Sequence, residues 1–547
     1  MGKEALIAVV NNMENKKVKI VSIISIIALA LTLVTATFAY FVAQTGEGKS
    51  TDIKINANTV DTFTFETGSA ISLNLNQDNF ASGKGNQTGT TFAKAMLSAN
   101  NKTNTATEHY YMYLNISENT FTYTQDENAP EILLTIKDES NNEITSINGL
   151  IYKTVTDGKG ASISGFDITT KSGLITLFDN REITTTSSKT EKWNITLTYV
   201  NYNENQSANA GKSFNSNVMI QKEIIPSALS DICTSGNNLT TCITTLANNS
   251  KSDYTKIYHH TSTLTNGARD NSYRYAGANN SVKNYICLGS TETTCPEENL
   301  YRIIGVFKNN ELKQYYLKLI KSDFANSDLL GNDGNFAVNA NPSSSYLGNQ
   351  TILSAYKWNF KDGATDNSGS VSNNWNESLL NTKNLNLNFL TNIGTIWSNK
   401  IVVVKWNISG NTRNNLLYTT VKSSYQSEIV NPTTSDIFTS KIGLMYVSDY
   451  GYAANPSYWT YKYSDTELTD YRASINANWM YTGDYEWTIT KFSDYDSSVA
   501  VVLKEGNIDL SYSDNIMYLR PTFYLNSDVS YYLGDGTINN PYKIVVN

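Results

Sequence analysis

The chain opens with a long uncharged segment, and this segment limits where the rest of the protein can fold. From Ile20 to Ala43 every residue is apolar, aromatic, Ser or Thr. A helix rises about 1.5 Å per residue, so this run would span about 36 Å, more than the hydrocarbon core of about 30 Å. Lys16, Lys17 and Lys19 stand just before it, and basic flanks favour the cytoplasmic side. We therefore predict a cytoplasmic basic end at 1–19, a transmembrane helix or signal peptide at 20–43, and an extracellular remainder.

Two fates of the apolar segment are open. Either it stays as the anchor of a single-pass membrane protein with an extracellular C-terminus, or it is cleaved after Ala39 and the protein is secreted. The length of the run favours the anchor, whereas the small residue Ala39 favours cleavage.

Composition narrows the class of protein further. With 547 residues the chain is expected to hold several domains. Charged residues make up 17%, the net charge is -8 and no block of Lys or Arg follows the N-terminus, which argues against a nucleic-acid partner. With three His and four Cys, the chain has few candidate metal ligands or catalytic nucleophiles. We expect no cofactor and no metal.

Residues 50–222 alternate between apolar and polar side chains, as half-buried strands do. Asp157-Gly158 adds a hairpin-turn signal, and the whole pattern predicts a β-sandwich. Trp193, inside one such stretch, is expected in the core. The alternating stretches are Thr62–Phe65, Ile71–Leu75, Tyr111–Ile116, Ile132–Ile136 and Trp193–Tyr199.

Residues 20–222 resemble a known group. The apolar segment ending in Ala36-Thr37-Phe38-Ala39-Tyr40-Phe41, followed by a β-sandwich that closes with 205–214, is similar to the camelysin and TasA-like biofilm-matrix proteins of Gram-positive bacteria. The resemblance implies secretion and possible assembly into a homopolymeric fibre. The chain has no His-Glu-x-x-His, so the peptidase activity attached to some camelysins has no zinc site here.

Residues 223–257 differ in composition from the preceding strands, with Leu, Ile, Thr and Asn. We expect them to form a linker with a short helix near 241–247. Four cysteines follow one another closely, and four allow three disulfide connectivities. Outside the cell, sequential pairing as Cys233–Cys242 and Cys287–Cys295 is the economical choice. The adjacent His259 and His260 point in different directions, so we expect turn or surface residues there and no metal site.

Residues 258–547 are rich in aromatics and hold seven of the eight tryptophans. Two strand-like runs, 301–307 and 315–320, flank a turn at 309–311 and predict a hairpin. Apolar residues at helical spacing occupy 378–390, and 401–404 reads as a buried strand. We therefore expect a mostly β protein with minor α, in which an α+β domain follows the sandwich.

This second region also resembles a known group. The runs 301–307, 442–452, Glu486-Trp487-Thr488-Ile489 and Arg520-Pro521 recur in surface proteins of Firmicutes. Those domains look like the C-type-lectin-like fold, which formylglycine-generating enzymes share. No Cys follows Cys295, so that enzyme activity is not implied. Asn455-Pro456-Ser457 and Trp375-Asn376-Glu377 only approximate the motifs of calcium-dependent lectins, which argues against a sugar-binding calcium site.

An enzyme is not expected. The acids Asp449, Asp484, Glu486, Asp494 and Asp496 could supply a carboxylate pair, but we expect them to be solvated surface residues. None of the histidines lies among the aromatic loops. Arg520 is expected to be structural, paired with a carboxylate or with backbone carbonyls.

Rings in loops point instead to a non-enzymatic surface protein, an adhesin that binds a glycan or a protein on a neighbouring surface. The alternative is a structural subunit of an extracellular matrix fibre. For any single ring, the alternative interpretation is that it packs in the hydrophobic core of the domain and does not contact a ligand. The candidate ligand-binding rings are Tyr458, Trp459, Tyr461, Tyr481, Tyr485 and Tyr512.

Overall fold

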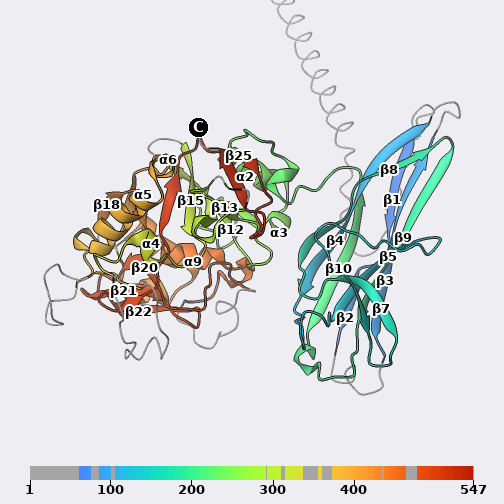
Figure 1. Ribbon diagram of the computed structural model, residues 1–547, viewed down its shortest axis with the longest axis horizontal. Coiled ribbons are helices and arrows are strands. Elements are labelled where there is room, and N and C mark those ends of the chain that lie inside the picture. The colour runs from blue at the N-terminus through green and yellow to red at the C-terminus, as the bar shows by residue number, and fades with distance from the viewer. Residues whose placement is uncertain are drawn as a thin grey trace, which may run out of the picture. The chain divides into compact units, whose positions relative to one another are not determined.

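The computed structural model (Figure 1) describes residues 61–75, 85–99, 105–290, 292, 294–309, 314–336, 355–359, 372–408, 410–432, 436–463 and 477–545. The described chain forms two compact units, which divide between Glu223 and Ile224. The apolar run 20–43 lies outside these residues. Among the helices that are described, none is long and apolar enough to cross a membrane.

The first unit is a β-sandwich, as the alternating sequence predicts. Its two sheets pack through a core that contains Trp193 and Phe178, whose ring centroids are 4.6 Å apart. In order across the first sheet, the strands are β1 (Thr62–Thr67), β3 (Gln87–Ser98), β9 (Ser188–Tyr199), β5 (Ile132–Asp138), β7 (Ser162–Asp167) and β6 (Tyr152–Thr156). Across the second sheet they are β2 (Ile71–Asn74), β10 (Ser213–Gln221), β4 (Ala106–Asn119) and β8 (Gly173–Thr185).

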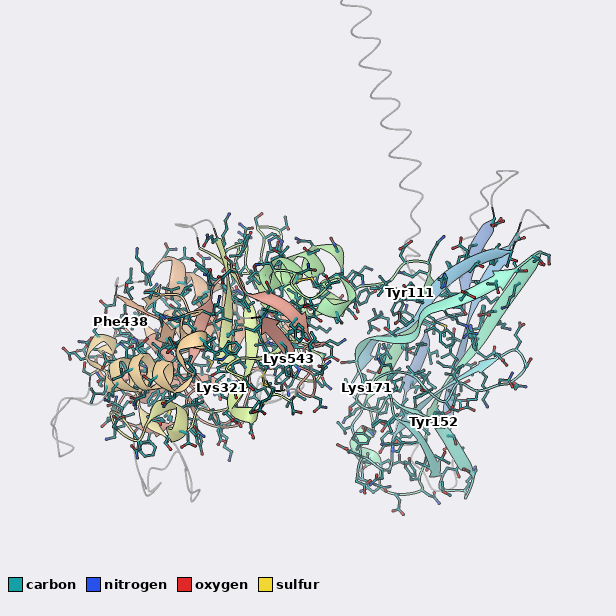
Figure 2. All side chains as sticks on the ribbon, turned by 45° about the horizontal axis from the view of Figure 1, so that its top comes forward. Tyr111, Tyr152, Lys171, Lys321, Phe438 and Lys543 are labelled. Carbon is teal, nitrogen blue, oxygen red and sulfur yellow. A yellow bond between two sulfur atoms is a disulfide. The ribbon has the colours of Figure 1, made fainter. Side chains whose placement is uncertain are left out.

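Strand periodicity located five of these strands correctly: β1, β2, β4, β5 and β9. In β10, buried and half-buried residues alternate along the whole strand. Asp157 and Gly158 begin the turn between β6 and β7, and Asp157 Oδ1 accepts hydrogen bonds from the N–H groups of Lys159 and Ala161. Tyr152, at the start of the edge strand β6, is labelled in Figure 2.

The second unit is built on a mixed sheet of nine strands. The main order is β19 (Ile442–Gly443), β24 (Thr522–Leu525), β15 (Gln314–Lys321), β14 (Leu300–Asn309), β13 (Tyr285–Cys287), β26 (Tyr542–Val545) and β25 (Ser530–Leu533). Two further strands, β12 (Tyr273–Tyr275) and β11 (Ile257–His259), extend it from β14. The predicted hairpin is confirmed as the antiparallel pair β14 and β15.

Smaller elements surround this sheet. Three short sheets are formed by β20 (Glu486–Lys491), β21 (Ser498–Val502) and β22 (Ile508–Tyr512), by β17 (Val404–Asn407) and β18 (Ile437–Ser440), and by β16 (Tyr356–Lys357) and β23 (Ile516–Met517). The helices are α2 (Leu239–Asn249), α3 (Ser252–Thr255), α4 (Ser327–Leu330), α5 (Leu390–Asn392), α6 (Thr395–Ser398), α7 (Arg413–Leu417), α8 (Val421–Tyr425) and α9 (Val447–Ala453), with π-helices η6 (Leu380–Phe389) and η7 (Gln426–Val430). Single 3-10 turns are η2 (Ser207–Asn209), η3 (Leu229–Asp231), η4 (Glu297–Asn299), η5 (Trp375–Glu377) and η8 (Pro456–Tyr458).

Several details differ from expectation. The segment expected as a linker packs into the second unit, since Leu239, Ile243 and Leu246 of α2 belong to its core. The strand expected at 401–404 begins at Val404, and Val403 is exposed. Both expectations rested on local composition, which does not report what a segment packs against.

Both predicted disulfides are present. Cys233 bonds Cys242 and Cys287 bonds Cys295. The first ties the chain before α2 to the helix itself, and the second closes the turn between β13 and β14. Each spans a short loop, and disulfides of this kind persist in oxidising compartments.

Candidate functional site

The predicted ring at Trp459 lies in the core of the second unit. Its side chain is 1% exposed, and its ring packs 5.6 Å from Tyr258, 5.1 Å from His260 and 5.1 Å from Tyr452. Its indole Nε1 donates to the carbonyl of Ala454 at 3.0 Å. A ring held in this way has no face for a ligand. All seven tryptophans of this unit are at most 8% exposed, so they belong to its core.

The predicted tyrosines lie nearer the surface, at different elements. Tyr458 is half-buried and its ring is 6.0 Å from that of Tyr461, which is 36% exposed. Tyr481 is half-buried and its hydroxyl donates to the carbonyl of Lys504 at 2.9 Å. Tyr485 is half-buried just before β20, and Tyr512 ends β22 with 58% exposure. The structure thus brings Tyr458 and Tyr461 together and places Tyr512 on a separate strand.

A surface that the sequence did not reveal lies at α7 and β22. Helix α7 begins after Thr412, whose hydroxyl caps it by accepting from the N–H of Asn415. The guanidinium of Arg413 forms an ion pair with Asp509 of β22, and its carbon lies 5.6 Å from the ring centroid of Tyr418. The backbone N–H of Arg413 donates to Asp494 Oδ1 at 3.1 Å. Tyr418 and Tyr495 are both exposed.

We call this set the Arg413 surface: Arg413, Tyr418, Asp494, Tyr495 and Asp509. Its members come from three segments of the chain: α7 with the residue that follows it, the loop between β20 and β21, and β22. Burial acts to lower the pKa of the Arg413 guanidinium, whereas the ion pair with Asp509 and the nearby Tyr418 and Tyr495 act to raise it. The net effect is a raised pKa. The arrangement offers exposed rings beside a held cation and two carboxylates. Tertiary packing brings α7 onto β22 and onto Asp494, so no short sequence pattern could have predicted this surface.

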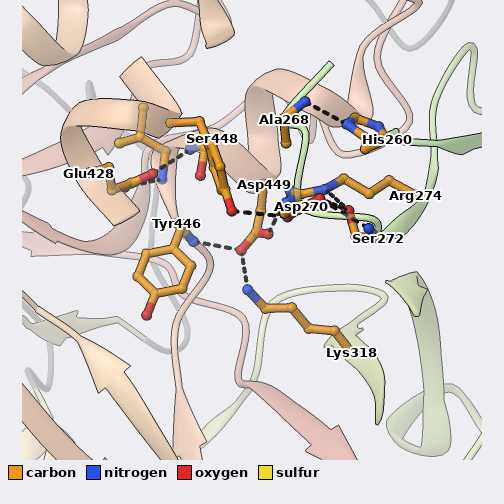
Figure 3. A network of polar contacts seen from close by, with 12 residues as sticks. His260, Ala268, Asp270, Ser272, Arg274, Lys318, Glu428, Tyr446, Ser448 and Asp449 are labelled. Atoms are coloured by element: carbon orange, nitrogen blue, oxygen red, sulfur yellow. Dashed lines mark hydrogen bonds and ion pairs between the residues drawn. The ribbon is translucent and has the colours of Figure 1, made fainter. Parts of the chain in front are cut away.

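A second unusual feature is a buried network of charges (Figure 3), which also lies in the second unit. Asp449 and Glu428 are both buried at the N-terminus of α9. Glu428 accepts hydrogen bonds from the N–H groups of Val447 and Ser448 at 3.0 Å, and Asp449 accepts from the N–H of Tyr446 at 2.9 Å. The first N–H groups of a helix lack partners within the helix, so the two carboxylates satisfy them. Burial raises the pKa of Glu428.

Two cations on the central sheet face this helix end. Arg274 on β12 and Lys318 on β15 both pair in register with Gly305 of β14, so they flank it on the sheet. A Cβ atom at Gly305 would come within 2.2 Å of the carbonyl oxygen of Tyr273, so only glycine fits there. Lys318 Nζ lies 2.6 Å from Asp449 Oδ2, and Arg274 Nη1 lies 3.8 Å from Asp449 Oδ1.

The network continues through Arg274 towards the surface. Arg274 Nη2 donates to Asp270 Oδ2 at 2.6 Å, and the Tyr425 hydroxyl donates to the same oxygen at 3.0 Å. Burial works to raise the pKa of Asp270, but the charge of Arg274 and the hydrogen bonds from Ser272 hold it well below its usual value. His260, expected at a turn or the surface, is fully buried, and its Nδ1 accepts from the N–H of Ala268 at 3.0 Å.

The five acidic residues considered for catalysis lie in different environments. The expectation that all are solvated is wrong for Asp449 and Glu486, which are buried in ion pairs with Lys318 and Arg520. Asp494 and Asp496 are exposed and Asp484 is half-buried. Within the described ranges no three His, Cys, Asp or Glu side chains are grouped so that they could hold a metal ion.

Comparison with known proteins identifies no relative: no family model, no curated protein and no solved structure matches the chain significantly. The resemblances to the camelysin and TasA-like group and to the C-type-lectin-like fold therefore stay predictions.

Proposed function

We propose that this chain is a non-enzymatic bacterial surface protein whose second unit binds a glycan outside the cell, with the β-sandwich as its support. The observation that carries the proposal is the Arg413 surface, where exposed tyrosine rings stand beside an arginine held by carboxylates. Rings stack on the C–H faces of sugars, and guanidinium and carboxylate groups are good hydrogen-bond partners for their hydroxyls.

Two other features support an extracellular binding module. Both disulfides fit an oxidising compartment. The two ends of the second unit lie together, because Asn238 bridges Ser530 and β26 pairs with β13. Paired ends with long loops elsewhere are what a lectin-like fold would have, and this fold is part of the proposal.

Glycan binding by purified full-length protein and its variants tests the proposal. We expect Tyr418→Ala, Tyr495→Ala and Arg413→Ala each to weaken binding to an array of cell-wall and host glycans about tenfold, since a well-placed ring or arginine contributes about 1–2 kcal/mol. Tyr532→Ala is the matched control, because Tyr532 is also an exposed ring but lies on β25, an edge strand of a different sheet from β22.

The melting temperature must stay unchanged in these variants for the test to count. Glycan binding that the Tyr418→Ala, Tyr495→Ala and Arg413→Ala variants all retain at the level of the Tyr532→Ala control would contradict the proposal. Loss of cell adhesion without any glycan binding would show that the partner is a protein. The predicted rings Tyr461 and Tyr512 are exposed, so alanine at these two positions extends the same series.

The alternative is a subunit of an extracellular fibre. It is favoured by one observation: the first unit is an open sandwich, in which β1, β6, β2 and β8 lie at the edges of the two sheets. An edge strand presents N–H and C=O groups that a strand from a neighbouring copy can pair with. Sedimentation of the ectodomain from Tyr40 as filaments, and not as a monomer, would favour this function.

A further inference from the structure

The side chain of Lys318 is enclosed by aromatic rings in the core of the second unit. Its Nζ lies 4.5 Å from the ring centroid of Tyr446, 5.3 Å from that of Tyr524, 5.4 Å from that of Phe307 and 5.7 Å from that of Trp406. Strand register places Tyr524 directly beside Lys318, and the side chain of Lys318 is 1% exposed. The four rings therefore form a cage that keeps water away from the amine.

One carboxylate enters this cage. Asp449, 2% exposed, brings Oδ2 to 2.6 Å from Lys318 Nζ. The N–H of Tyr446 donates to the same oxygen at 2.9 Å. The other oxygen, Oδ1, has Arg274 Nη1 at 3.8 Å. The amine and the carboxyl group are thus in contact, dry and fixed in orientation, which is the condition under which an intramolecular reaction is fastest.

Burial also changes which state of the pair is favoured. In water an amine and a carboxylic acid stay apart mainly because both ionise and are solvated. A buried ion pair loses that solvation, and burial lowers the pKa of Lys318 although Asp449 opposes the shift. A neutral amide carries no charge to desolvate. The cage therefore disfavours the ion pair relative to an amide and a released water molecule.

We propose that Lys318 and Asp449 condense into an intramolecular amide bond that ties β15 to α9. The ammonium first passes one proton to Oδ2, which leaves a neutral amine beside a carboxylic acid. Nζ then attacks Cγ of Asp449, and the negative charge that develops on Oδ1 faces Arg274. Nζ gives a second proton to Oδ2, the Cγ–Oδ2 bond breaks and water leaves. Nζ keeps one hydrogen, so atoms and charge balance, and no oxidant or other reactant is consumed.

Mass spectrometry of the purified full-length protein, reduced and unfolded, tests the bond directly. We expect a mass that is one water below the sequence value. We also expect no tryptic cleavage after Lys318, because trypsin needs a free amine there, and a branched peptide that joins the segments around Lys318 and Asp449. On a denaturing gel the cross-linked chain should migrate faster than the Lys318→Arg variant, in which the guanidinium keeps the charge but does not form the bond.

Lys321→Arg is the matched control. Lys321 (labelled in Figure 2) lies on the same strand and is also buried, but its Nζ donates to the backbone carbonyl of Glu297 at 2.9 Å, and an amide carbonyl does not acylate an amine. This variant should keep the loss of water. Recovery of separate, linear tryptic peptides from the native protein, with cleavage after Lys318 and the full sequence mass, would overturn the proposal even if Lys318→Arg failed to fold.

Discussion

Arg520 and Glu486 form a bidentate ion pair in the core of the second unit. Arg520 Nε lies 2.7 Å from Glu486 Oε1, and its Nη2 lies 2.9 Å from Oε2. The same Nη2 donates to the carbonyl of Met480 at 2.7 Å. Both side chains are buried. The pair links β20 to the segment that leads into β24, which are in different sheets, so the two charges fix how these sheets meet.

Removing one partner of this pair should be costly. Arg520→Ala leaves the carboxylate of Glu486 buried without its cation, and such a loss typically lowers the free energy of unfolding by about 3–5 kcal/mol. Denaturant unfolding followed by tryptophan fluorescence of the second unit measures the change. An unchanged unfolding midpoint would contradict a structural role for Arg520.

Replacing both charges separates the net value of the pair from the penalty of an unpaired charge. We expect Arg520→Met combined with Glu486→Leu to recover much of the stability that Arg520→Ala loses, because neither variant side chain needs a buried partner. A double variant as unstable as the single one would show that the pair itself stabilises the fold.

His260 should make the second unit sensitive to mild acid. Burial lowers the pKa of His260 well below its usual value, and the charge of Arg274 lowers it further. The unfolded histidine binds a proton near pH 6.5, whereas the folded one stays neutral. Stability is therefore complete above about pH 6.5 and falls as the pH decreases, by up to about 1.4 kcal/mol per unit for one proton.

The His260→Gln variant, whose side-chain oxygen can still accept from Ala268, should lose most of this slope when unfolding is measured between about pH 6.5 and 5. Burial also lowers the pKa of His259, so the slope that remains is expected to come from that residue. His109→Gln is the control, because His109 belongs to the first unit and its side chain is 42% exposed. A slope that His260→Gln leaves intact would show that another group titrates.

Local sequence patterns predicted the parts of the fold that depend on neighbours in the chain. The alternation in 193–199 and the hairpin pairing of β14 with β15 are local, and so is the pairing of cysteines 8 and 9 positions apart. The buried charges are different. Asp449 lies 131 positions from Lys318, and Glu486 lies 34 positions from Arg520. Only the packing of α9 and β20 onto the central sheet buries them.

The candidate site shows the same limit. The high aromatic content of 458–487 predicted ligand-binding rings there. Hydrophobic periodicity in this stretch is too weak to separate core side chains from surface side chains. Trp459 is buried because β11 and α9 supply Tyr258 and Tyr452 around it. Arg413 and Asp509 are 96 positions apart, and neither belongs to a recognisable motif. Their surface follows from tertiary structure alone.

The disulfide at Cys233 should stabilise the start of the second unit. It encloses a short loop, with the two cysteines 9 positions apart, and the loop-entropy relation gives about 2.5 kcal/mol for such a loop. Cys233→Ser with Cys242→Ser should therefore lower the unfolding free energy by about that amount. Peptide mapping without reductant should find Cys287 still joined to Cys295 in this variant; free thiols at these two positions would contradict the assignment.

Trp459 and Tyr461 separate the core from the surface within one short segment. Trp459→Ala removes a ring enclosed by Tyr258, His260 and Tyr452 and leaves a cavity, which should lower the unfolding free energy by about 3–5 kcal/mol. Tyr461→Ala changes a side chain at the surface, so its effect on stability should stay within about 0.5 kcal/mol. Thermal unfolding and glycan binding should both be measured on the two variants. Trp459→Ala should lower the melting temperature, whereas Tyr461→Ala should lower glycan affinity at an unchanged melting temperature if Tyr461 contacts the ligand. Equal loss of stability in both variants would place Tyr461 in the core as well and remove it from the candidate ligand-binding rings.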